Sequence, residues 1–312
     1  MHYAVGLDGG GTKTNLEARA EDGRVLLRAA FGSMNLNSAS EQTVAETFRD
    51  CAAALRALPG GLSNCQAVCI GSAGVSNPDA CRTLERLLRG CGYDGPLLLR
   101  GDQETALAGA LGRPDGMVLI AGTGSICFGR GAAGKTARCG GYGHKIDDEG
   151  SGYALGRDAL AAVVRAGDGR IPETMLTRLV YERLGITDVR GLVRFTYAPK
   201  TDKKEIAALA PLVSEAAAAG DAAAKQIIEK ACRELAALVE PVARALHFEA
   251  GQLALAGGIL LYVQAVQDGV KARLRRRFPQ LECVTPKEDA ASGAALLAWE
   301  AVREPAALQA IY

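Results

Sequence analysis

Short β-type runs separated by glycine-rich turns open the chain. Residues 3–7 are mostly apolar and lead into residues 8–12, which read DGGGT. Alternation of apolar and polar residues resumes over 14–18, a turn follows at 21–23, and a further run covers 25–31. This spacing predicts a strand, a glycine turn, a second strand, a turn and a third strand.

The same order returns in the second half of the chain. Residues 117–121 are apolar and end in the glycine turn 122–125 (GTGS). A second run at 126–128, a turn within 129–134 and a third run at 135–138 follow. Two copies of one α/β unit are the most economical explanation of this repeat.

The remaining periodic segments fit a duplicated α/β fold. Helical spacing predicts helices after the first three strands, with buried strands between them and with long alanine-rich helices in the second half. The predicted helices cover 42–58, 80–90, 102–111, 205–219, 221–247, 261–278 and about 290–302, and the further strands cover 67–70, 97–100 and 253–256.

Composition and charge exclude several classes of protein. The 312 residues carry 36 basic and 35 acidic side chains, a net charge of +1, so no global basic field is available to hold nucleic acid or an anionic membrane. The arginine-rich run at 273–277 is interpreted as a solvated helix face. The start MHYAVGLDGG has no basic segment before Asp8 and does not resemble a secretory signal. The apolar stretch at 253–263 is shorter than the ~18 residues of a membrane span. We expect a cytoplasmic protein without nucleic-acid or membrane partners.

Cysteine usage indicates reduced thiols. Nine cysteines form an odd set without a CxxC pair. Cys65 and Cys69 are the closest pair, but only His2, His144 and His247 could join them as nitrogen ligands, so a zinc site is not favoured.

The two glycine turns are candidate phosphate sites. Glycine lets backbone N–H groups approach an anion closely. One such turn could equally be an ordinary hairpin, because hairpins often need glycine for positive φ. Two turns at matching places, the first preceded by Asp8 at a strand end, favour a nucleotide site with Mg²⁺.

A Walker A match competes with this interpretation. Gly129, Gly134, Lys135 and Thr136 have the G-x-x-x-x-G-K-T spacing. A true P-loop leads into a helix, whereas three glycines between 140 and 143 disfavour a helix here. The dinucleotide fingerprint also fails, since residues 9–11 precede a strand.

Taken together, the motifs resemble those of the actin/hexokinase/Hsp70 superfamily. Within it the chain is most similar to the N-acetylglucosamine kinases and their BadF-type relatives, the activator ATPases of 2-hydroxyacyl-CoA dehydratases. The motifs run in the expected order over nearly the whole chain: DGGGTKT from residue 8, AGTGS from 121, GGYGH from 140, DEGS from 148, AGGI from 256 and ASGAA from 291.

This resemblance implies a role for each site residue. Asp102 corresponds to the catalytic base and Asp8 to the Mg²⁺ ligand. Asn35, Gly74, Asp102, Tyr142 and Asp148 are the implied sugar contacts. The implied ATP contacts are Gly9, Gly10, Gly11, Thr12, Lys13, Gly122, Thr123, Gly124, Gly257 and Gly258.

Each residue also has a simpler interpretation. Asp102 could only cap a helix, Asp148 could cap a loop, and Asn35 is a natural turn residue. Tyr142 could pack in the core or form a sugar platform.

Two departures from the family pattern concern the sugar. Tyr142 stands where the human-type kinases have Trp, and Asp147 replaces a Gly. The activator ATPases carry a cluster-binding Cys near the DEGS motif, and no Cys lies there in this chain, which favours a kinase.

The prediction is an α/β protein with duplicated ribonuclease H-like (actin-like ATPase) domains and a nucleotide cleft between two lobes. The lobes span 1–115 and 116–289, and the last helix, about 290–312, packs back on the first. We expect an ATP- and Mg²⁺-dependent kinase that phosphorylates N-acetylglucosamine at O6 and forms a homodimer. The alternatives are a glucosamine or other hexosamine kinase, an activator-type ATPase acting on a partner protein, and a sugar sensor without turnover.

Overall fold

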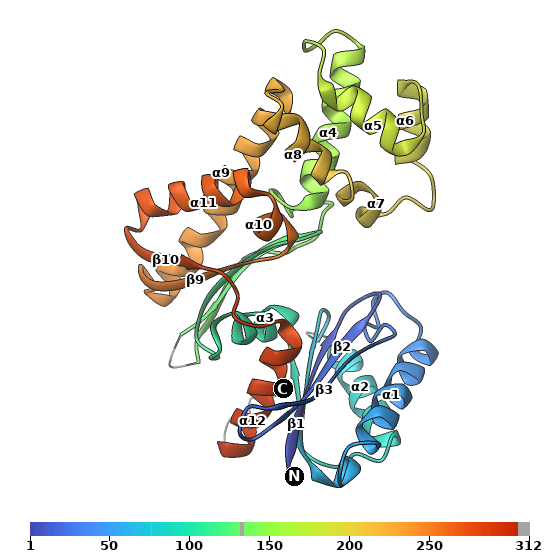
Figure 1. The fold of residues 1–312 in the computed structure, drawn as a ribbon, viewed down its shortest axis with the longest axis vertical. Coiled ribbons are helices and arrows are strands. Elements are labelled where there is room, and N and C mark those ends of the chain that lie inside the picture. The colour runs from blue at the N-terminus through green and yellow to red at the C-terminus, as the bar shows by residue number, and fades with distance from the viewer. Residues whose placement is uncertain (76, 132–133, 305–312) are drawn as a thin grey trace. The chain divides into compact units, whose positions relative to one another are not determined.

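The computed structural model describes residues 1–75, 77–131 and 134–304. The chain divides into two compact units, the first made of residues 1–116 and 286–312 and the second of residues 117–285. Each unit contains one five-stranded sheet with helices packed on it (Figure 1).

In the first unit the sheet has the order β3-β2-β1-β4-β5. Strands β1 and β2 are antiparallel, as are β2 and β3, whereas β4 runs parallel to β1 and to β5. The strands are β1 (Tyr3–Gly9), β2 (Thr14–Ala20), β3 (Val25–Phe31), β4 (Cys65–Ser72) and β5 (Leu97–Arg100). The helices are α1 (Glu41–Arg56), the 3-10 turn η1 (Gly61–Asn64), α2 (Pro78–Gly90), α3 (Asp102–Leu111) and α12 (Ala290–Arg303).

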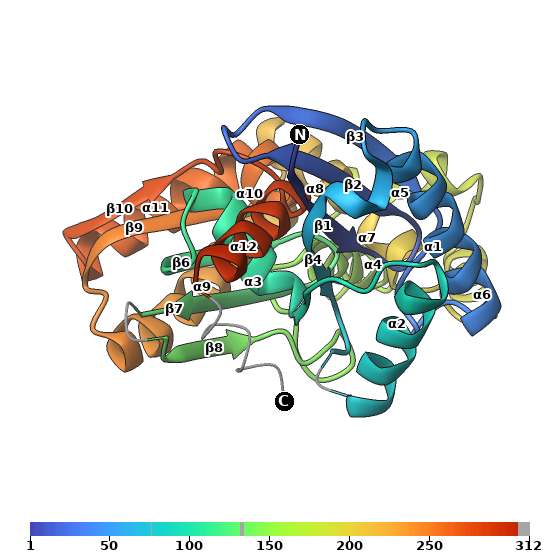
Figure 2. The same ribbon diagram turned by 90° about the horizontal axis from the view of Figure 1, so that it is seen from below.

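Because successive side chains of β1 point to opposite faces of the sheet, the strand contributes to an apolar core on each face. Val5 and Leu7 pack with Phe48 of α1 in one cluster, and Ala4 packs with Ala294 of α12 in another. Small residues dominate the second cluster, so α12 and α3 lie close to β1 and to each other (Figure 2).

Glycine is required where α12 approaches its neighbours. A Cβ atom on Gly6 of β1 would lie 2.1 Å from the Ala291 carbonyl oxygen, and one on Gly293 would lie 2.0 Å from the carbonyl oxygen of Thr105 in α3. Because these contacts are with backbone atoms, no side-chain rearrangement could relieve them.

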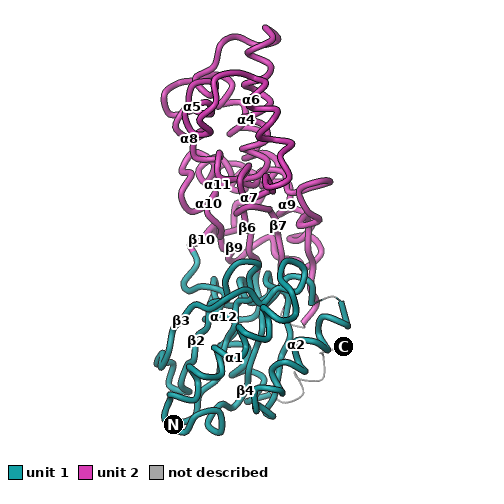
Figure 3. Tube along the Cα trace, turned by 90° about the vertical axis from the view of Figure 1, so that its right-hand side faces the viewer, with its two compact units in different colours: residues 1–116, 286–312 teal, residues 117–285 magenta. Residues whose placement is uncertain are grey.

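Buried charges join α12 to β2. The fully buried Glu17 pairs with Arg19 and Arg28 and accepts a hydrogen bond from Ser292 Oγ at 2.7 Å. The indole of Trp299 donates to the Arg19 carbonyl oxygen at 2.9 Å. The last helix is therefore part of the first unit, and Figure 3 draws α12 in teal, the colour of that unit.

The second unit repeats the strand order, as β10-β9-β6-β7-β8. Here β6 and β9 are parallel, as are β9 and β10, while β7 and β8 are antiparallel. Reading from the other edge, β8-β7-β6-β9-β10 matches β3-β2-β1-β4-β5, and the prediction of a duplicated α/β fold is confirmed. The strands are β6 (Gly116–Ala121), β7 (Ser125–Arg130), β8 (Thr136–Gly140), β9 (Ala250–Ala256) and β10 (Gln280–Val284).

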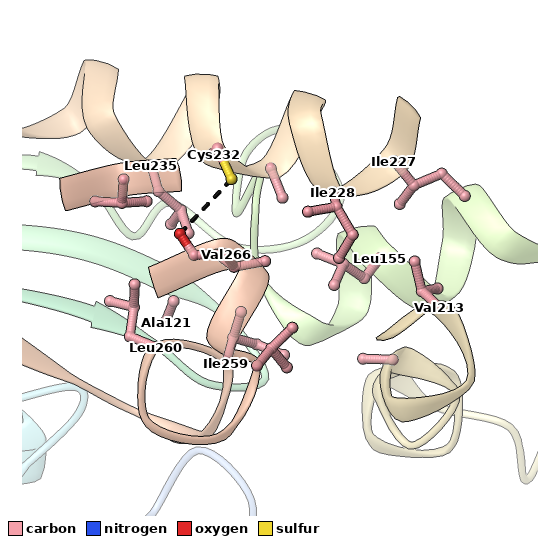
Figure 4. Packing of buried hydrophobic residues seen from close by; sticks show 14 of the residues in the cluster. Ala121, Leu155, Val213, Ile227, Ile228, Cys232, Leu235, Ile259, Leu260 and Val266 are labelled. Atoms are coloured by element: carbon pink, nitrogen blue, oxygen red, sulfur yellow. Dashed lines mark hydrogen bonds between the residues drawn. The ribbon is translucent and has the colours of Figure 1, made fainter. Parts of the chain in front are cut away.

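Eight helices of the second unit are described. They are α4 (Gly152–Gly167), α5 (Met175–Leu184), α6 (Val189–Thr196), α7 (Lys203–Ala207), α8 (Ala210–Ala218), α9 (Ala222–Leu246), α10 (Gly258–Tyr262) and α11 (Gln264–Arg277). Residues of α9, α10 and α11, including Leu235, Leu260 and Val266, pack in one apolar cluster (Figure 4). Asp221 caps α9 by accepting from Ala224 N and also accepts from Met175 N at the start of α5.

Two predicted helices are each broken in the structure. The helix predicted at 205–219 is divided into α7 and α8, with Pro211 in the first turn of α8. The helix predicted at 261–278 is divided into α10 and α11, because Val263 has φ −102° and ψ 84°. The predicted last helix ends at Arg303, and its continuation to 312 lies outside the described residues.

Among the described residues no single helix is both long and apolar enough to cross a membrane, although the bent pair 203–218 and 222–246 passes the same test by length and composition.

Candidate functional site

The first glycine turn, between β1 and β2, is held by its own backbone. Gly10 N donates to Lys13 O at 3.0 Å and to Asp8 O at 3.2 Å. A Cβ atom on Gly10 would lie 2.8 Å from that Lys13 oxygen, so a side chain there would open the turn. In the described part of the chain the amides of Gly11 and Lys13 have no protein acceptor. They are available to a ligand anion.

Asp8 is the penultimate residue of β1, beside this turn. Burial raises the pKa of its carboxyl group, and the negative charges of Asp102 and Asp289 act in the same direction, against a hydrogen bond from Asn15 Nδ2 at 3.2 Å. Within the ranges that the structure describes, no three His, Cys, Asp or Glu residues form a metal-binding group. A half-buried carboxylate near two other carboxylates fits one cation that keeps most of its water or phosphate ligands.

Asp102 is the first residue of α3 and not its cap. Gly101 occupies the N-cap position, where its amide donates to the Glu104 side chain at 3.1 Å, and this corrects the prediction that Asp102 caps the helix. Asp102 is exposed, and its Oδ1 accepts from the Gln103 amide at 3.0 Å. The helix N-terminus therefore favours the ionised carboxylate.

Asn35 and Gly74 line the same small cavity of about 10 Å³ in the first unit. Asn35 Oδ1 accepts from Asn37 N at 2.9 Å, so the side chain makes the expected turn contact. Ser33 Oγ donates to Gly10 O at 3.1 Å, which ties this segment to the first glycine turn. Gly74 has φ 91°, and a side chain there would collide with Asn37.

The second glycine turn, between β6 and β7, is fixed by α4. Gly122 N donates to Gly124 O at 2.9 Å across the turn. Gly152 N at the start of α4 donates to Gly122 O at 2.7 Å, and Tyr153 N donates to Thr123 O at 3.3 Å. Among the residues described, no protein group accepts from the amides of Thr123 and Gly124.

Asp148 contacts this second turn directly. Its Oδ1 accepts from Ser125 N at 3.2 Å, and a Cβ atom on Gly124 would lie 3.0 Å from its carboxylate. Asp148 is buried and has φ 63°, a strained conformation for a residue with a side chain. The structure thus places this predicted sugar ligand against the loop, a contact that sequence analysis missed.

Tyr142 is not a core residue. It is 64% exposed, and Arg138 lies over its ring at 4.6 Å from the centroid. Asp147, which replaces the family's Gly, accepts from Tyr142 N through Oδ2 at 3.1 Å and so holds the loop.

The Walker A alternative is wrong. Thr136 begins strand β8 and not a helix, and Lys135 Nζ donates to Ala245 O at 2.8 Å. The arginine-rich end of α11 is a helix face paired with acidic residues, since Arg273 contacts Glu229 and Arg277 contacts Glu240.

A pocket of 740 Å³ opens beside the second glycine turn, wholly within the second unit. Gly257, with φ 85°, packs against β6 so tightly that a Cβ atom would lie 2.4 Å from Ala121 O. The next residue, Gly258, is part of the pocket wall. Residues of α7, α8 and α10 form a helical wall of this pocket, which was not predicted from the sequence. The lining residues are Gly122, Thr123, Gly152, Lys204, Ala207, Ala208, Ala210, Pro211, Ser214, Glu215, Ala218, Gly258, Ile259, Tyr262 and Val263.

Known proteins share both sequence and fold with this chain. An N-acetylmuramic acid/N-acetylglucosamine kinase of Clostridium acetobutylicum is 35% identical over 301 residues, which are 96% of this chain and 98% of that protein. An N-acetyl-D-glucosamine kinase of Dictyostelium discoideum is 29% identical over 94% of this chain and 97% of its own length. A solved structure from Chromobacterium violaceum, provisionally assigned as an N-acetylglucosamine kinase, is 32% identical with a TM-score of 0.77, covering 95% of this chain and 99% of that one.

The model of the BadF/BadG/BcrA/BcrD ATPase family matches residues 5–298, almost the whole length of the chain. The resemblance read from the motifs is confirmed, and the chain belongs to the BadF/BadG/BcrA/BcrD ATPase family.

Proposed function

We propose that this chain is an ATP-dependent kinase that transfers the γ-phosphate to the 6-hydroxyl of N-acetylglucosamine. The observation that carries the proposal is the pocket beside Gly122 and Thr123, which has the volume of a small-molecule site and a backbone turn with unused donors at one end. The names of the related proteins support an amino sugar as the acceptor.

Asp102 is our candidate for the catalytic base. Phosphoryl transfer needs positioning and charge neutralisation more than covalent chemistry. An exposed carboxylate at the N-terminus of α3 could orient a sugar hydroxyl and accept its proton.

Asp8 is our candidate for holding Mg²⁺. The ion would offset negative charge on the nucleotide phosphates. The half-buried carboxylate, with Asp102 as a second negative charge nearby, supports this assignment. Asn15 keeps the Asp8 side chain in one orientation.

Asn35, Gly74, Tyr142 and Asp148 are our candidates for the contacts with the amino sugar. Asp148 would use the carboxylate oxygen that Ser125 N does not occupy. A cytoplasmic location and a homodimer stay predictions.

The test is ADP release measured in a coupled assay across a panel of sugars. The panel contains N-acetylglucosamine and N-acetylmuramic acid, which the relatives' names include, glucosamine, which is the acceptor in the alternative predicted from the sequence, and glucose. A kinase releases ADP in proportion to the amount of sugar that it phosphorylates. We expect N-acetylglucosamine to give the highest kcat/KM. NMR of the product should place the phosphate on O6.

Other outcomes would favour the alternatives. ATP hydrolysis that is unchanged by every sugar would support a partner-driving ATPase, and sugar binding without turnover would support a sensor. A folded Asp102→Asn variant should turn over at least ~100-fold slower with near-normal binding of both substrates. A normal kcat in that variant would overturn the assignment of Asp102.

A further inference from the structure

One aromatic side chain in the 740 Å³ pocket has no structural task. Tyr262 is the last residue of α10 and lines the pocket, yet its side chain is 84% exposed. In the described part of the chain its hydroxyl group makes no hydrogen bond. The ring lies alongside Gly258, where a Cβ atom would be 3.9 Å from Tyr262 Cδ2.

The pocket combines a backbone turn with a helical wall. At the turn, Thr123 supplies a backbone amide that has no acceptor among the described residues. On the wall formed by α8, the small and apolar Pro211 and Ala218 face the pocket one above the other along the helix, and the polar Ser214 and Glu215 lie between them. Because α8 rises about 1.5 Å per residue, that wall extends roughly 10 Å. A triphosphate tail at the turn leaves a flat heterocycle as the group for the helical wall.

We propose that Tyr262 is a base-stacking residue, which packs its ring on the purine of the bound nucleotide and gives this chain its preference for purine over pyrimidine nucleotides. The inference rests on the proposed function, because it assumes that the pocket holds a nucleotide. A phenol ring offers a large face at a small cost in conformational entropy, and a base stacks on it without base-specific hydrogen bonds. Since purines have the larger face, stacking favours them.

The chain offers a matched control. Tyr197 follows α6, is 83% exposed and does not line this pocket. Because both tyrosines are exposed, replacing either with alanine should leave the melting temperature unchanged. A change in affinity that is confined to Tyr262→Ala therefore reports on the pocket and not on folding.

The experiment measures binding of ADP, UDP and inorganic tripolyphosphate by calorimetry, without sugar. We expect Tyr262→Ala to weaken ADP binding about ten-fold, to lower the ADP/UDP preference, and to leave tripolyphosphate binding within about two-fold. Tyr262→Phe should bind ADP like the wild type, because it retains the ring. Tyr197→Ala should match the wild type for all three ligands.

Four results would overturn the inference. They are unchanged ADP affinity in Tyr262→Ala, an equal loss of tripolyphosphate affinity, an unchanged ADP/UDP preference, and a Tyr262→Phe variant as weak as the alanine variant. If the wild type bound ADP but failed to phosphorylate any sugar, only the proposed function would fail. If it bound no ADP, both would fail.

Discussion

Replacing Glu17 with glutamine should lower the stability of the first unit far more than the loss of an exposed ion pair does. The side chain is fully buried, its Oε1 lies 2.5 Å from Arg19 Nε, and its Oε2 lies 2.6 Å from an Arg28 guanidinium nitrogen. Glutamine keeps the shape, but it removes the charge and turns an NH₂ group toward an arginine donor. Breaking a buried ion pair typically costs about 3–5 kcal/mol.

The structure narrows that range to its lower end. The Arg28 side chain is 53% exposed and can recover solvation, and Arg19 keeps Glu288 at 2.7 Å. We therefore expect a loss of about 3 kcal/mol in the free energy of unfolding. With a urea m-value of about 2 kcal/mol/M, the midpoint should fall by roughly 1.5 M.

The assay is tryptophan fluorescence during urea unfolding. Trp299 is the single tryptophan of the sequence, and its indole is bonded to Arg19 O next to the substituted site, so its emission reports on α12 leaving β2. Glu288→Gln is the control, because Glu288 pairs with Arg19 at the surface with 40% side-chain exposure, and such pairs contribute about 0–1 kcal/mol.

Equal midpoints for Glu17→Gln and Glu288→Gln would refute the reasoning, since burial would then have no energetic consequence. If Glu17→Gln cannot be obtained folded, Ser292→Ala tests the same cluster by removing the hydrogen bond that Ser292 Oγ donates to Glu17 and the one that it accepts from Arg28. That variant should lose about 1.5–3 kcal/mol, and an unchanged midpoint would contradict the argument.

Further predictions concern the second unit. Gly124→Val should weaken ADP binding because its side chain would meet the Asp148 carboxylate, whereas Lys135→Ala, which loses only a contact with α9, should bind ADP normally in the same titration. The side chain of Asp148→Asn can still accept from Ser125 N, so this variant should raise KM for the sugar about ten-fold and leave KM for ATP unchanged. Asp148→Ala also loses the contact with the turn and should raise both KM values. Identical KM changes in the two variants would contradict a role of Asp148 in both the sugar site and the turn. Burial opposes ionisation of Asp221, but hydrogen bonds from the amides of Ala224 and Met175 dominate and lower the pKa of its carboxyl group. Its stabilising contribution is therefore present above the ordinary pKa of an aspartate and is lost as the pH falls through the lowered value. Asp221→Ala should cost about 2 kcal/mol at pH 7, measured by circular dichroism, and the difference from the wild type should vanish in acid.

Local signals predicted the sheets well. Strands β1 and β6 are each followed by a glycine turn that the sequence predicted. Such turns can be predicted because strand alternation and turn residues are local signals that extend over a few positions. The bounds of α3 were predicted correctly, but its cap was not, because Gly101 has no side chain to signal a cap and the contact that holds it comes from Glu104 three residues later.

The features that could not be predicted from the sequence depend on long-range packing. The sequence analysis assigned no elements between 152 and 200, where α4, α5 and α6 are observed. The break at Val263 separates α10 from the rest of the helix expected at 261–278. As a result, α10 lines the pocket, with Tyr262 as its last residue. The contact of Asp148 with Ser125 joins residues that only the folded backbone brings together.

The position of α12 imposes an order on folding during synthesis. The second unit is one continuous stretch, residues 117–285, and all of its strands are synthesised before α12. The first unit begins earlier in translation but waits for residues 290–303 to cover the face of β1 that carries Ala4 and Gly6. The unit synthesised first is thus completed last, and nascent chains that stop before residue 290 present an uncovered apolar sheet face to chaperones and proteases.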